Sequence, residues 1–111
     1  MSGITTHVLD TSRGRPAAGV PVVLERADGS GWDVVGRGTT DADGRARDLL
    51  TSAPENGRYR LTFDTGAYFR AVGEAPFYPE VTVTFAVERG DEHYHVPLLL
   101  SPFGYSTYRG S

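Results

Sequence analysis

The stretch HYHVPLLLS, residues 93–101, decides the fold class of this 111-residue chain. Because successive side chains of a strand point to opposite faces, one face carries the apolar residues at 94, 96, 98 and 100, which suffice for a core. The other face carries His93 and His95 beside a proline and a leucine. A solvent-exposed strand face seldom carries proline and leucine beside two histidines, so we expect this face to lie against another subunit or to line a pocket. Pro97 lacks the N–H that a central ladder needs, which predicts a bulge or a sheet edge.

Other segments of the sequence show the same alternation of apolar and polar residues. It predicts strands at 58–63 and 81–88, and a hairpin of 20–26 with 32–37 around the turn residues 28–31. Between 58–63 and 81–88, residues 64–72 combine alanines and aromatics with a cap at Asp64 or Thr65, which predicts a short helix ending near Gly73. The fold class is therefore all-β, a sandwich or barrel with one short helix.

Composition limits what the chain does. Its length fits one domain, 1–111, and fourteen acidic against eleven basic residues give a net charge of -3, so we expect no nucleic acid and no anionic membrane as a partner. The chain has no cysteine, which excludes disulfides and thiolate chemistry. It has no apolar run of the ~20 residues that a membrane span needs, and no signal-peptide core in its first twenty residues, so we expect a cytoplasmic protein.

The candidate general bases are the three histidines, His7, His93 and His95, since only histidine titrates near neutral pH without a perturbed pKa. Alternation places His7 on a face with Thr5 and Leu9. A single strand histidine is more often simply bonded to a neighbouring carbonyl than catalytic. The pair at 93 and 95, with His7 as a third ligand, also has a spacing that zinc sites use, but no carboxylate completes the shell. We therefore expect no metal and no cofactor.

Two further segments, residues 39–45 and residues 105–111, contain candidate ligand-binding residues. Residues 39–45 form a turn through Asp43-Gly44, and Arg45 leaves it with a donor fork that suits paired oxygens, although in a chain with eleven arginines a solvated surface arginine is the more common case. The ending YSTYRGS, residues 105–111, is aromatic and basic where most chain ends are polar and frayed. It either frays or forms a final strand whose end enters a cleft.

Three patches together resemble one family, the transthyretin-like 5-hydroxyisourate hydrolases. The first patch is THVLD at 6–10 with GRPA at 14–17, the second is TDADGR at 40–45, and the third is YHVPLLLSP at 94–102 running to YRGS at 108–111. The similarity covers essentially the whole chain. The final YRGS is the most specific motif of the three.

The resemblance implies a prealbumin-like sandwich of two four-stranded sheets with one short helix, over a single hydrolase domain at 1–111. It also implies a homotetramer with active sites in the channel between dimers. The implied reaction opens the cyclic amide of 5-hydroxyisourate with water, in urate breakdown. By position the catalytic residues are His7, Arg45 and His95, and the substrate-binding residues are Tyr108, Arg109, Gly110 and Ser111. His93 falls outside this set and is expected to be a surface residue whose loss matters little.

Two other functions stay open. Residues 14–22 and 40–45 also fit a non-catalytic transthyretin-like binding module, because both kinds of protein need the same turns. A carrier of small ligands in the channel between dimers is the other alternative. The histidine strand and the YRGS ending favour the hydrolase.

Overall fold

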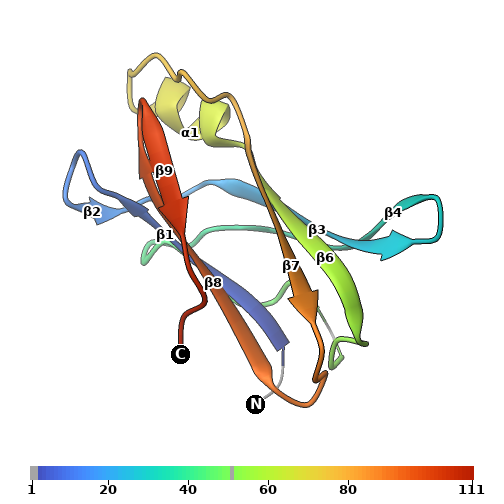
Figure 1. Cartoon of the computed structure of the whole chain (residues 1–111). Helices are drawn as coiled ribbons and strands as arrows, with labels where there is room; N and C mark the ends of the chain where they lie inside the picture. The colour runs from blue at the N-terminus through green and yellow to red at the C-terminus, as the bar shows by residue number, and fades with distance from the viewer. Residues whose placement is uncertain (1–2, 51) are drawn as a thin grey trace.

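A computed structural model describes residues 3–50 and 52–111 of the chain as two packed β-sheets with a short helix at one end (Figure 1). The first sheet comprises β1 (Gly3–Asp10), β2 (Arg15–Pro16), β5 (Arg45–Ala46), β8 (His93–Ser101) and β9 (Gly104–Thr107). The second comprises β3 (Pro21–Asp28), β4 (Gly31–Thr39), β6 (Gly57–Phe63) and β7 (Val81–Val87). The helix α1 is Thr65–Ala71.

The predicted sandwich is confirmed. The first sheet runs β2-β1-β8-β9 and the second runs β4-β3-β6-β7, so each has a row of four strands. The two-residue β5 is added to the first sheet, where it pairs with β1. β1 and β8 pair in parallel, with Gly3 opposite His93 and Asp10 opposite Leu100, and this pairing joins the two ends of the chain.

The core lies between the sheets and follows the predicted alternation. The inner side chains of β8 are at most 6 % exposed at positions 94, 96, 98 and 100. Those of β6 at 59, 61 and 63 are at most 2 % exposed and lie in the same apolar cluster. Burial of each such side chain contributes roughly 1.5–3 kcal/mol to folding, so these positions fix which face of each strand points inward.

The predicted hairpin and helix are also confirmed. β3 and β4 pair antiparallel, with a bulge where the register shifts between Leu24 and Glu25. The Asp64 side chain caps α1 by accepting a hydrogen bond from the Ala67 N–H at 3.0 Å, and Gly73 follows the helix end with a φ of 81°. In the described part of the chain no helix is long and apolar enough to cross a membrane.

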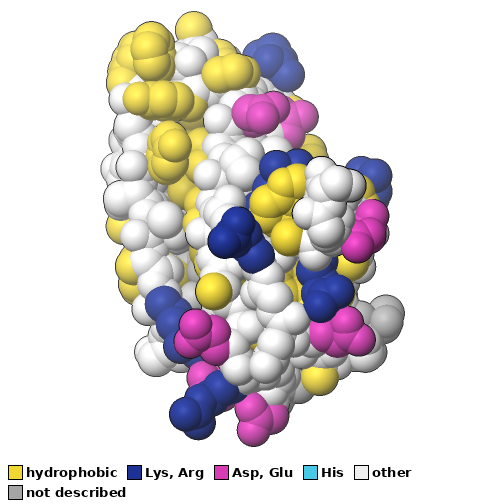
Figure 2. Space-filling view, turned by 45° about the vertical axis from the view of Figure 1, so that its right-hand side comes forward, with side chains coloured by type: hydrophobic (Ala, Val, Ile, Leu, Met, Phe, Trp, Pro, Cys, Tyr) yellow, Lys and Arg dark blue, Asp and Glu magenta, His cyan; other side chains and the backbone are white. Residues whose placement is uncertain are grey.

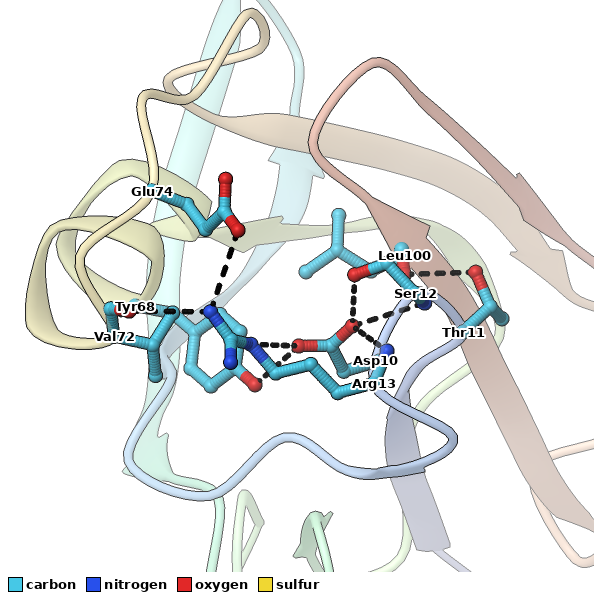
Figure 3. Close-up of polar contacts among 8 residues, drawn as sticks. All are labelled: Asp10, Thr11, Ser12, Arg13, Tyr68, Val72, Glu74 and Leu100. Carbon is cyan, nitrogen blue, oxygen red and sulfur yellow. Dashed lines mark hydrogen bonds and ion pairs between the residues drawn. The ribbon is translucent and has the colours of Figure 1, made fainter.

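A buried carboxylate ties β1 to the helix (Figure 3). Asp10 is fully buried, and it accepts hydrogen bonds from the Tyr68 hydroxyl at 2.6 Å and the Ser12 hydroxyl at 2.7 Å. The Arg13 side chain contacts Asp10 at 3.3 Å and donates to the Val72 carbonyl at the helix end at 3.1 Å. Because one carboxylate serves these donors, the end of β1 and the helix are held together.

The network shifts the pKa values of its members. Burial alone would raise the pKa of Asp10, but the hydrogen bonds from Tyr68 and Ser12 and the Arg13 guanidinium outweigh it and lower that pKa. Burial, together with the Asp10 charge, raises the pKa of Tyr68 to about 12. Asp10 is therefore ionised in the folded protein at neutral pH, and Tyr68 keeps its proton.

Replacing Tyr68→Phe should lower the free energy of unfolding at neutral pH by roughly 1.5–3 kcal/mol, because it removes a hydrogen bond to a buried charge. The folded pKa of Asp10 lies below its ordinary 3.8, so the stability it contributes is present above 3.8 and is lost as the pH falls through the folded value. Urea unfolding at neutral pH and well below pH 3.8 should show the difference shrinking on acidification. Tyr105→Phe, at a 44 % exposed tyrosine, is the control. An equal loss at both pH values would contradict a role for the Asp10 charge.

Candidate functional site

The registers of three strands bring the predicted catalytic residues to the outer face of the first sheet. Thr5 of β1 lies opposite His95 of β8, and His7 of β1 lies opposite Arg45 of β5. Because Thr5 and His7 are two positions apart on one strand, they share a face with both of these partners. His7, Arg45 and His95 are all half-buried. Residues separated by up to 90 positions in the sequence are therefore neighbours.

The turn before β5 positions Arg45 and His7 together. The Asp41 carboxylate accepts hydrogen bonds from the Asp43 N–H at 2.9 Å and the Arg45 N–H at 3.0 Å, and these bonds, the one from Arg45 first, lower the pKa of Asp41. Gly44 has a φ of 78°, and a Cβ there would lie 2.4 Å from the Val8 carbonyl oxygen, so only glycine fits. His7 Nε2–H donates to the Asp43 carbonyl at 2.9 Å.

A pocket of about 290 Å³ opens beside these residues. It is lined by Thr5, Thr6, Arg45, Arg47, His93, His95 and Ser111. Arg45 and His95 therefore share one pocket with the end of the C-terminal segment. His7 does not line it, because its ring bonds the Asp43 carbonyl at the neighbouring position. Two guanidinium groups on the wall favour a ligand rich in carbonyl oxygens or negative charge.

His95 is held at two sides of its ring. Its Nδ1 lies 2.8 Å from the Thr5 hydroxyl, and its Cδ2 edge packs against Gly110. Burial is the main cause that lowers the pKa of His95, and the positive charge of Arg45 lowers it further. The imidazole is therefore neutral at neutral pH, which is the form that can accept a proton.

The C-terminal segment returns to His95 beyond β9. The Gly110 N–H donates to the His95 carbonyl at 2.8 Å, and a Cβ at Gly110 would lie 2.5 Å from His95 Cδ2. Arg109 packs over the Tyr94 ring at 4.4 Å and donates to Glu92 at 3.1 Å. Tyr108 is 57 % exposed. The segment thus lies along β8, as expected if residues 105–111 form a final strand. Gly110 and Ser111 are its residues nearest the pocket.

The expectation of a bulge or an edge at Pro97 is met in part, because β8 is not an edge strand but Pro97 lies at an unpaired gap in its ladder to the C-terminal segment. β8 lies between β1 and β9, and the register that pairs Leu98 with Thr107 also pairs His95 with Gly110. The carbonyls of His95 and Pro97 both face the C-terminal segment, where the Pro97 carbonyl accepts from the Thr107 hydroxyl at 2.7 Å. The missing N–H of Pro97 therefore falls opposite Tyr108, where the backbone ladder is open.

The expectation that His93 is an uninvolved surface residue is also corrected. His93 is half-buried, lines the pocket, and its Nε2 lies 2.9 Å from the same Thr5 hydroxyl that contacts His95. The physical reason is the alternation of β8, which puts positions 93 and 95 on one face. The two imidazole rings lie 6.3 Å apart at 25°.

Sequence reasoning missed Thr5 and Arg47. Thr5 is 8 % exposed and joins two histidines, and the available signal was its position two residues before His7 on the same face. Arg47 lies two residues beyond Arg45, and no local signal separates it from the other arginines. Over residues 3–50 and 52–111, no group of three or more histidine, aspartate or glutamate side chains is placed to hold a metal ion.

A family model and a curated relative place this chain in the same family. The family model described as "HIUase/Transthyretin family" matches residues 4–110. A curated relative from Caulobacter vibrioides, named 5-hydroxyisourate hydrolase, is 50 % identical over 115 aligned positions, which cover 100 % of both chains.

Solved structures of two kinds share the fold. The 5-hydroxyisourate hydrolase of Klebsiella pneumoniae is 38 % identical, with a TM-score of 0.89 over 100 % of both chains. Transthyretin from Sparus aurata is 34 % identical, with a TM-score of 0.93 over 99 % of this chain and 97 % of its own. Backbone shape therefore does not separate a hydrolase from a transthyretin, and the side chains of the site have to.

Replacing Gly110→Ala should displace the His95 ring or lift the C-terminal segment, because the added Cβ would lie 2.5 Å from His95 Cδ2. Either movement exposes the imidazole, so the pKa of His95 should rise toward its ordinary 6.5. An NMR titration of the His95 ring measures this shift. Gly104→Ala is the matched control, since a Cβ there meets its nearest neighbour at 3.7 Å. An unchanged His95 titration in Gly110→Ala would contradict the close packing.

Proposed function

This chain belongs to the HIUase/transthyretin family, and we propose that it hydrolyses 5-hydroxyisourate to 2-oxo-4-hydroxy-4-carboxy-5-ureidoimidazoline in urate breakdown. The main support is the full-length similarity to relatives that carry this activity in their name. The neutral imidazole of His95 beside the Arg45 guanidinium, in one pocket, gives that activity a chemical basis.

In the proposed mechanism His95 is the general base. It takes a proton from water as the water oxygen bonds to the ring carbonyl carbon of the substrate. Arg45 binds the carbonyl oxygen and stabilises the negative charge that develops there. The carbon–nitrogen bond of the cyclic amide then breaks, the leaving nitrogen takes up the proton that His95 removed from water, and the new carboxylic acid releases its own proton to solvent to become a carboxylate.

His7 and the segment 108–111 have supporting parts in this proposal. The Nε2 of His7 donates to the Asp43 carbonyl, so its unprotonated nitrogen in the neutral form is Nδ1, and His7 orients the water or carries the proton to the leaving nitrogen. Tyr108, Arg109, Gly110 and Ser111 bind the substrate ring. Ser111, which lines the pocket, supplies a hydroxyl to the substrate.

We also propose that the chain assembles as a homotetramer with its active sites in the channel between dimers. One support is an exposed aromatic cluster near the β8–β9 turn, where Phe103 is 75 % and Phe77 is 65 % exposed. Figure 2 shows hydrophobic side chains gathered at this end of the molecule. Another support for the tetramer is an apolar pocket of about 230 Å³ between residues 107–109 and β7, the edge strand of the second sheet. A subunit contact would remove these surfaces from water. The cytoplasm stays the predicted location.

A second candidate, carriage of a small ligand, is favoured by the structural likeness to transthyretin. Turnover separates the two functions, because a carrier binds its ligand without converting it.

The decisive experiment follows the ultraviolet decay of 5-hydroxyisourate made fresh from urate with urate oxidase. The protein should accelerate this decay over the spontaneous rate. His7→Ala and His95→Ala should each lose roughly 100- to 10,000-fold in kcat, because each removes a group that transfers or orients a proton. Arg45→Ala should lose activity, and Arg58→Ala, at an exposed arginine of the other sheet, is its control. Decay at the spontaneous rate with the unmodified protein would refute the hydrolase.

Sedimentation of the purified protein tests the assembly. The expected mass is four times that of the 111-residue chain, because the aromatic cluster and the pocket beside β7 need two kinds of contact. A monomer at every concentration would contradict the tetramer without touching the assignment of the reaction.

A further inference from the structure

One hydroxyl lies between two imidazoles at the edge of the pocket. The Thr5 oxygen is 2.8 Å from His95 Nδ1 and 2.9 Å from His93 Nε2. Thr5 is 8 % exposed, so water does not compete freely for this hydroxyl. The hydroxyl has one hydrogen and two lone pairs, so it donates to at most one of the two histidines, and at least one histidine donates to it.

A hydrogen-bond chain that runs from one histidine through the Thr5 hydroxyl to the other has two possible directions. The direction sets the tautomer of His95. If His95 Nδ1–H donates to Thr5, the Thr5 hydroxyl donates to His93 Nε2, and His95 Nε2 is left with a lone pair. If the chain runs the other way, Thr5 donates to His95 Nδ1, and the proton of His95 sits on Nε2. Only the first direction leaves Nε2, the ring nitrogen that does not contact Thr5, able to accept a proton.

The charges around the ring favour the first direction. Arg45 and Arg47 line the same pocket as His95, and their positive charges attract a lone pair on Nε2 and repel an N–H there. His93 on its own strand and His7 on β1 also act on His95 through their charge, and Ser111 lines the same pocket. The backbone of His93 is also held, since Arg109 donates to its carbonyl at 3.3 Å.

We propose that Thr5 and His93 are positioning residues that hold neutral His95 with its proton on Nδ1 and an unprotonated Nε2 toward the pocket. The proposal rests on the proposed function, in which His95 is the base, and it deepens that function by assigning the tautomer. When water gives its proton to Nε2, His95 becomes an imidazolium and its Nδ1–H bond to Thr5 strengthens. Passing the Nε2 proton on to the leaving nitrogen restores the starting tautomer.

The first measurement is the ¹⁵N chemical shift of the His95 ring nitrogens in the full chain at a pH where His95 is neutral. Nδ1 should appear protonated and Nε2 unprotonated. In Thr5→Val, which removes the hydroxyl, and in His93→Phe, which removes the acceptor but keeps a ring, the proton should shift toward Nε2. This readout needs no turnover, so it tests the hydrogen-bond chain even if the hydrolase assignment fails.

The second measurement is turnover of 5-hydroxyisourate. Thr5→Val and His93→Phe should each lower kcat by about 10-fold or more with KM little changed, a smaller loss than the roughly 100- to 10,000-fold expected for removing the base itself. Thr5→Ser keeps the hydroxyl and should restore kcat. Thr62→Val makes the same substitution on the second sheet and should leave kcat unchanged. Thermal unfolding of each variant identifies any loss of fold, and His93→Phe, which breaks the same hydrogen-bond chain at its other end, keeps the test valid if Thr5→Val does not fold.

Two results would overturn the proposal. One is a protonated His95 Nε2 in the unmodified protein. The other is an unmodified kcat in folded Thr5→Val and His93→Phe. Absence of turnover in the unmodified protein would instead refute the proposed function, so the two failures are distinguishable.

Discussion

The parallel pairing of β1 with β8 is the constraint on which the rest of the structure depends. It places Thr5 opposite His95, and because β5 pairs with the other side of β1, it also sets Arg45 beside His7. A shift of one residue in this register would turn the histidines into the core and the apolar residues of β8 outward. The core face and the chemical face of these strands are therefore fixed by one register.

Hydrogen bonds from neighbouring elements hold several groups of the site in place. The Asp41 carboxylate shapes the turn before Arg45, the Asp43 carbonyl holds His7, and Thr5 joins the two histidines of β8. At the far end of β1, Asp10 fixes the helix through Tyr68 (Figure 3). β1 is thus anchored at one end by a buried charge, and it carries the candidate site along the rest of its length.

The sequence predicted most of the fold and part of the site. Alternation correctly separated Tyr94 and Val96 from His93 and His95, because burial enforces a period of two along every strand. At Pro97 it could not tell an edge strand from a gap in the ladder of an inner strand, because the effect of a missing N–H depends on which neighbour faces it, and that neighbour is an unpaired stretch of the C-terminal segment. It also failed to connect His93 with the site, because the connection runs through a threonine 88 residues away.

The sequence by itself determined which residues face inward, where the helix begins, and which side chains are chemically able to act, since these follow from local periodicity and residue type. Only the tertiary structure decided which of those side chains meet. His95 lies 90 residues from Thr5 in the chain, and their contact at 2.8 Å exists because two distant strands pair in one register. The lowered pKa of His95 depends on burial and on Arg45, and the proposed tautomer depends on the contact with Thr5; none of these is encoded near position 95.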